Sequence, residues 1–183
     1  MRYLKLSTAL VITAFALGVI SGLASEPAIR GRFIDEVVRE LRPIIEGLAI
    51  NPLITALLIF LNNLRVSLIS FLTGPTLVVP LAIIYFNGYV VGAFLNYPSR
   101  PLIHNLILLM PHGVLELPAI LLSASLGTTL SLAMIHKYMF KADVSVSRLL
   151  ISHSRHLALI ALLLAIAALV EVFITPLVGV FIG

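Results

Sequence analysis

Long apolar runs separated by short polar breaks dominate the chain and predict helices that cross a membrane. The runs cover residues 6–24, 52–73, 76–95, 117–138 and 156–180. Each is about 20 residues long, the length a helix needs to cross the hydrocarbon core of a bilayer. None shows the two-residue alternation of a membrane β-barrel strand. The pattern predicts an all-α membrane protein of about five transmembrane helices in a single domain, residues 1–183. Residues 96–101, with two prolines and an arginine, read as a surface loop.

Residues 28–49 follow a different pattern, in which apolar positions recur at helical spacing and charged residues fill the remaining positions. Phe33, Val37 and Leu41 are four residues apart and share one helix face, whereas Asp35 and Arg39 lie on another. A helix of this kind lies in the membrane interface or over the bundle and does not cross the bilayer. It either covers the bundle or docks a partner, and the pattern leaves both roles open.

Residues 111–119 interrupt the apolar pattern with two prolines, a glycine, a histidine and a glutamate. The apolar residues before them, 102–110, would span only about 13 Å as a helix, too short to cross a bilayer. We therefore predict a re-entrant or half-helix over residues 102–116, interrupted at Pro111, Gly113 and Pro118. Pro118 would then lie in the first turn of the next span, with Glu116 at its positive dipole end.

Composition excludes a soluble fold and gives no reason to expect a nucleic-acid partner. Only 11% of the residues are charged, whereas soluble domains carry about 25%. The net charge of +4 fits membrane topology and contact with lipid headgroups. Basic residues near the N-terminus and in residues 137–155 predict that both are cytoplasmic and, after five crossings, that the C-terminus is outside. The sequence contains no cysteine, which excludes disulfides and thiolate metal sites.

Several polar side chains lie inside the apolar runs, where an ionisable group suggests a functional site. They are Asn62, Asn63, Arg65, Asn87, His112, Glu116 and Glu171. A mid-membrane arginine costs about 2.5–3.5 kcal/mol, so we expect Arg65 to face the interior and pair with Glu116 or Glu171. The cluster either satisfies the interrupted backbone or binds a cation, a proton or a metal ion.

Signals for a metal site or a hydrolase are weaker. His112 and Glu116 are four residues apart and could share a helix face, but two ligands fall short of the usual three or four. Ser123 and Ser125 are in no Gly-x-Ser-x-Gly motif, and such residues in membrane helices usually pack or hydrogen-bond between helices. We expect no cofactor and no enzymatic activity. The other histidines are expected at membrane interfaces, without a role: His104, His136, His153 and His156.

Glycines four residues apart provide small-residue faces at Gly18/Gly22 and at Gly88/Gly92. Such faces let two helices approach closely, either within one chain or between two chains. We predict a homodimer packed through faces of this kind and keep the contact within one chain as the alternative.

Four motifs together resemble a known family: Asn62-Asn63-Leu64-Arg65, Asn87-Gly88-x-x-x-Gly92, Pro-His-Gly-x-x-Glu-Leu-Pro-Ala at 111–119, and Glu171-x-x-x-Thr175-Pro176. On these motifs the chain is similar to the stage II sporulation protein M family of integral membrane proteins, over about residues 1–180. In spore-forming bacteria the namesake acts with two other membrane-anchored proteins, which carry the wall-degrading activity, in peptidoglycan remodelling. The resemblance implies a non-enzymatic component that assembles or localises an envelope complex. The alternative is a small ion or solute transporter with a polar site at the interrupted helix.

Overall fold

The computed structural model describes residues 2–97 and 101–182, and every regular element in these ranges is helical. The elements are α1 (Arg2–Ala24), α2 (Pro27–Ile50), α3 (Pro52–Leu72), the 3₁₀ turn η1 (Gly74–Thr76), α4 (Val78–Leu95), α5 (Leu102–Met139), α6 (Val146–Ser154), α7 (Leu157–Phe173) and α8 (Thr175–Ile182). Five stretches are long and apolar enough to cross a membrane: α1, α3, α4, α5 and the run from α6 to α8. The predicted all-α class with five spans is confirmed. Residues 98–100 of the predicted surface loop lie outside this description.

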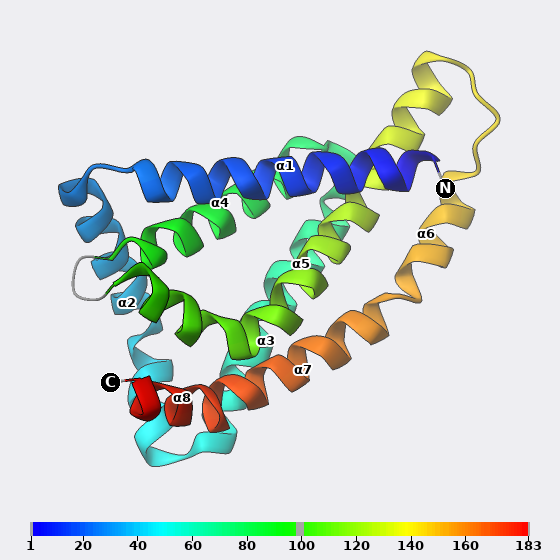
Figure 1. Cartoon of the computed structure of the whole chain (residues 1–183). Helices are drawn as coiled ribbons and strands as arrows, with labels where there is room; N and C mark the ends of the chain where they lie inside the picture. Colours follow the sequence, from blue (N-terminus) through cyan, green and yellow to red (C-terminus); the bar gives the residue numbers. More distant parts are fainter. Residues whose placement is uncertain (1, 98–100, 183) are drawn as a thin grey trace.

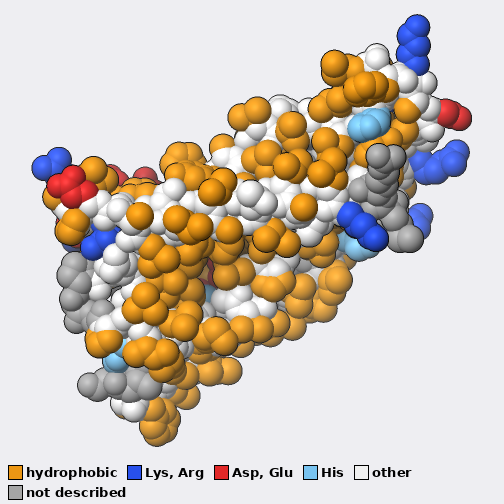
Figure 2. Space-filling model, turned by 45° about the horizontal axis from the view of Figure 1, so that its top comes forward, with side chains coloured by type: hydrophobic (Ala, Val, Ile, Leu, Met, Phe, Trp, Pro, Cys, Tyr) orange, Lys and Arg blue, Asp and Glu red, His pale blue; other side chains and the backbone are white. Residues whose placement is uncertain are grey.

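The two ends of the bundle differ in their loops and in their charge. The start of α1 and the loop after α5 lie at one end, and the C-terminus lies at the opposite end (Figure 1). On the face shown in Figure 2, apolar side chains predominate between the ends, and several lysine and arginine side chains lie at the end that holds the loop, with one acidic side chain. The opposite end carries both basic and acidic side chains (Figure 2). Which end faces the cytoplasm stays a prediction.

The two glycine faces pack against each other within the chain. A Cβ on Gly18 or Gly22 would meet the backbone of α4, and one on Gly88 or Gly92 would meet the backbone of α1. Because both faces are buried in this contact, they cannot also join two copies of the chain. The predicted homodimer contact through these glycines is therefore wrong, and the contact within one chain is the one observed.

α2 confirms the predicted amphipathic helix and runs across one end of the bundle (Figure 1). Ile34 and Arg30 are buried, and the Arg30 guanidinium donates a hydrogen bond to the Ser25 carbonyl at 2.9 Å. The Phe33 ring meets the Tyr89 ring of α4 edge to face, with centroids 4.8 Å apart. α2 therefore covers the ends of its neighbours and exposes its charged face.

α5 is one helix of 38 residues, not a half-helix followed by a separate span. Figure 1 shows that it bends sharply in its first half. Pro111 and Pro118 each remove one backbone donor while the rest of the hydrogen-bond ladder continues, so the helix bends without ending. Gly113 stays helical, and no described glycine has a positive φ. Glu116 and Pro118 therefore lie inside a helix and not in its first turn, contrary to the prediction.

Small polar residues and close backbone contacts tie α5 to its neighbours. The Ser123 hydroxyl donates to the Ser67 carbonyl of α3 at 2.8 Å, and the Thr129 hydroxyl donates to the Ser7 hydroxyl of α1 at 3.0 Å. A Cβ on Gly127 would meet the backbone of Ser70 and Phe71. Ser123 therefore acts between helices, as expected for a packing residue.

His153 does not lie at a membrane interface as predicted, because the segment before the last span contains a helix. Ser145 caps this helix, α6, by accepting a hydrogen bond from the Arg148 amide. His153 is buried at its end, with Nδ1 3.2 Å from the Leu126 carbonyl oxygen. His153 therefore connects α6 to α5 and does not face lipid headgroups.

Candidate cation site between two helix interruptions

Three side chains that the sequence singles out converge in the structure. His112 and Glu116 project from α5, and Glu171 projects from the last turn of α7. One potential ligand atom from each lies within 4.8 Å of the other two, and all three side chains are partly buried. We call His112, Glu116 and Glu171 the carboxylate–histidine cluster.

The cluster forms where two spans are interrupted. α5 contains Pro111 and bends in its first half (Figure 1), and the last span is divided at Ile174, between the end of α7 and the start of α8. His112 Nδ1 lies 3.3 Å from Thr175 Oγ1, so the two interruptions touch. Glu116 follows His112 by four residues and Glu171 precedes Thr175 by four. His112 and Glu116 share one face of the continuous helix α5, so this contact brings Glu116 close to the end of α7, where Glu171 lies.

Asn63 joins the cluster from α3. This residue is only 9% exposed, and its side chain lies near the Glu116 side chain. An amide N–H can donate to a carboxylate oxygen, so Asn63 can hold Glu116 in one orientation. Asn63 thereby brings a third spanning helix to the cluster.

The expected arginine partner is absent from the cluster. Arg65 is exposed, and its guanidinium donates to Asn62 Oδ1 at 3.3 Å. Within residues 2–97 and 101–182, neither Glu116 nor Glu171 forms an ion pair with lysine or arginine. The prediction that Arg65 faces inward and pairs with Glu116 or Glu171 is wrong. Because a helix turns about 100° per residue, burial of Asn63 places Arg65 on nearly the opposite side of α3.

The other predicted polar residues lie apart from the cluster. Asn87 donates to the Ile83 carbonyl of its own helix at 2.8 Å, and Asn62 contacts Arg65. Pro111 is partly buried and Pro118 is exposed, both inside α5. Sequence reasoning did not give Thr175 a role. Its position four residues after Glu171 and directly before Pro176 was the available signal.

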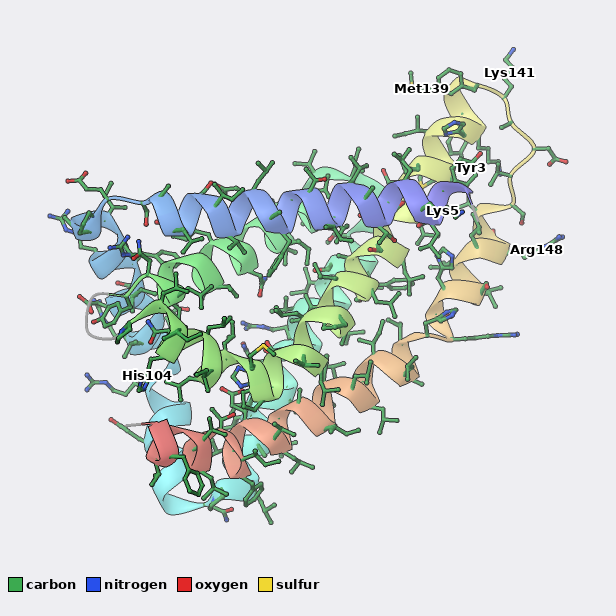
Figure 3. The ribbon with its side chains drawn as sticks, in the orientation of Figure 1. Tyr3, Lys5, His104, Met139, Lys141 and Arg148 are labelled. Carbon is green, nitrogen blue, oxygen red and sulfur yellow. The ribbon has the colours of Figure 1, made fainter. Side chains whose placement is uncertain are left out.

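A cavity of about 320 Å³ lies elsewhere, at the end of the bundle that holds the N-terminus. Its lining includes Tyr3, Leu126, Thr129, His153 and His156. Tyr3 and Lys5 lie at this end, whereas His104 lies at the other (Figure 3). The cavity is therefore separate from the carboxylate–histidine cluster.

The fold and the cluster define a polytopic helical membrane protein with ionisable groups between interrupted spans. The family model described as Stage II sporulation protein M matches residues 7–176. The chain therefore belongs to the stage II sporulation protein M family, as its four motifs led us to expect. Comparisons with curated proteins and with solved structures found no match.

Proposed function

We propose that this family member transports a proton or a small cation and binds it within the membrane at the carboxylate–histidine cluster. The observation that supports this best is the convergence of Glu116, Glu171 and His112 within 4.8 Å, with no lysine or arginine partner among the described residues. Two unpaired carboxylates are costly in a medium of low dielectric constant. A bound cation or proton lowers this cost by neutralising them. The proposed role is non-enzymatic.

The helix interruptions free backbone groups that such a site can use. Pro111 leaves the Ile107 carbonyl without its usual helix donor, and Pro118 does the same for Val114. Transporters build their sites from interrupted helices of this kind, where freed backbone groups line the ion path. Small changes in the bend of α5 and in the hinge between α7 and α8 would alter access to Glu116 and Glu171.

Flux in proteoliposomes tests the proposal. Purified protein is reconstituted and driven by a membrane potential, while internal dyes report protons, alkali cations and divalent metal ions. Glu116→Gln and Glu171→Gln keep the side-chain shape and should each reduce flux at least tenfold. Asn87→Ala, outside the cluster, is the matched control and should retain flux. Wild-type flux in the Glu116→Gln/Glu171→Gln double variant would contradict the proposal.

A second candidate is an assembly or localisation component of an envelope complex, and the exposed charged face of α2 favours it. Asp35, Glu36, Arg39 and Glu40 are exposed, with Arg39 and Glu36 paired at 3.2 Å. This face could dock another membrane protein outside the bundle. A homodimer, also part of this proposal, would use a surface other than the glycine faces.

Pull-down of the complex from its native membrane separates the two candidates. Replacing Asp35, Glu36 and Glu40 by serine should release a docked partner while flux in proteoliposomes remains. Glu116→Gln is the converse control and should keep the partner. Equal recovery of the same partners by the α2 variant and by the wild type would rule out docking through this face.

A further inference from the structure

We infer that the carboxylate–histidine cluster binds a divalent transition-metal ion, of the class that includes Zn²⁺ and Mn²⁺. The inference rests on the proposed function, since it names the ion for the same site. It extends the sequence interpretation, in which His112 and Glu116 alone supplied too few ligands. The structure adds Glu171 as the third.

The donor set suits such an ion. One imidazole nitrogen and two carboxylate groups form a combination found at zinc, manganese and iron sites. Ca²⁺ takes six to eight oxygen ligands and Mg²⁺ keeps several waters, so the imidazole disfavours both. Ligands around one zinc ion lie about 3–4 Å apart, given bonds of about 2.0–2.2 Å. The donor atoms of the cluster, within 4.8 Å of one another, need only modest side-chain rotation to reach this spacing.

Thr175 orients the histidine for binding. Its hydroxyl lies 3.5 Å from the Val170 carbonyl oxygen and donates toward it. The same hydroxyl oxygen can then accept the Nδ1–H of His112, 3.3 Å away. This tautomer leaves the lone pair of Nε2 for a metal ion. Histidine ligands are commonly held in this way by a hydrogen bond from their other ring nitrogen.

The charge of the cluster also matches that of a divalent ion. Two ionised carboxylates and a neutral imidazole carry a charge of −2, which one divalent ion cancels. The exposed position of Arg65 matters here, because an arginine at the cluster would repel the ion. Asn63 can hold Glu116 without adding charge. Three protein ligands leave a fourth position for water, as at zinc sites that exchange ligands.

Metal titration of the intact protein in detergent tests the inference. After treatment with a chelator, Zn²⁺ or Mn²⁺ should raise the melting temperature, and Mg²⁺ at equal concentration should not. Co²⁺ should produce visible absorption bands that report a nitrogen–oxygen site. His112→Ala, Glu116→Gln and Glu171→Gln should abolish both effects. His104→Ala is the matched control for adventitious binding by a histidine and should retain them.

The Thr175→Val variant tests whether Thr175 positions His112 for metal binding or has a purely structural role. It should weaken metal binding about 10- to 100-fold while the metal-free melting temperature changes little. Metal binding that persists in the Glu116→Gln/Glu171→Gln double variant would overturn the inference, as would equal stabilisation by Mg²⁺. Flux that needs both glutamates but survives full chelation would overturn the metal site and keep the transport proposal. Metal binding without any flux would keep the site and overturn transport.

Discussion

Arg65 lies where the packing of α3 places it, away from the interior. Asn63, Ser67 and Ser70 recur at helical spacing and are buried, so they define the inner face of this helix. Replacing the exposed Arg65 by leucine should therefore leave the free energy of unfolding unchanged or raise it by up to about 3 kcal/mol, since it removes a charge from the outer face of a span and no partner from the interior. Asn63→Leu should destabilise by about 1–3 kcal/mol, because it replaces a buried polar side chain near the partly buried Glu116 carboxylate by an apolar one. Thermal and denaturant unfolding in detergent measures both. A larger loss of stability for Arg65→Leu than for Asn63→Leu would instead support an arginine that faces the interior.

Gly113 permits a second test at the residue scale. It is buried and helical, and the nearest atom to an added Cβ is Leu109 Cγ at 3.5 Å, an ordinary contact. Alanine exceeds glycine in helix propensity by about 1 kcal/mol. Gly113→Ala should therefore be neutral or stabilising by up to about 1 kcal/mol and should keep metal binding. If the bend of α5 instead required glycine, unfolding measurements would show a loss.

The polar residues of the cluster could be selected from the sequence, but their partners could not. His112, Glu116 and Glu171 stand out because each is ionisable within an apolar run. Which of them meet depends on the rotation of each helix about its axis. In a soluble helix the apolar stripe reveals that rotation. In a membrane the outer face of a helix is as apolar as its inner face. The residues around Arg65 therefore do not show which way its side chain points.

At the scale of helices, the contact between α1 and α4 predicts how alanine substitutions at three glycines change stability. A Cβ on Gly22 or Gly92 would overlap backbone of the other helix, whereas one on Gly31 of α2 meets nothing within 4 Å. Gly22→Ala and Gly92→Ala should each destabilise the protein by about 1–3 kcal/mol, the usual cost of overpacking. Gly31→Ala, the control, should be neutral or slightly stabilising. The measurement is chemical unfolding in detergent, and equal stability of all three variants would contradict the packing.

The boundaries of the spans were the most predictable feature of the elements. Residues 52–73 became α3, Pro52–Leu72, and residues 76–95 became α4, Val78–Leu95. The continuity of α5 was not predictable in the same way. Proline ends most helices in water, but a helix within a bundle can keep its remaining backbone hydrogen bonds and bend. Pro111 and Pro118 are read as interruptions because the sequence does not show the neighbours that hold both arms.

At the scale of the whole molecule, charge divides the two ends unequally. Lys5, Lys141 and Arg148 lie at the end that also holds the N-terminus (Figure 3). At the other end α2 carries four arginines and four acids, Asp35, Glu36, Glu40 and Glu46. Loops rich in lysine and arginine stay in the cytoplasm. The structure places the C-terminus at the end away from these basic residues (Figure 1).

Cysteine labelling in cells can test this orientation without background, because the chain contains no cysteine. Glu36→Cys and Lys141→Cys both place the thiol at an exposed position. A membrane-impermeant maleimide should label Glu36→Cys in intact cells but label Lys141→Cys only after permeabilisation. The unmodified chain should remain unlabelled in both conditions. The reverse pattern would show that the molecule has the opposite orientation in the membrane. Labelling of both thiols in intact cells would show that the two ends do not lie on opposite sides. Neither result would alter the packing of Glu116 against Glu171, so topology and site are tested independently.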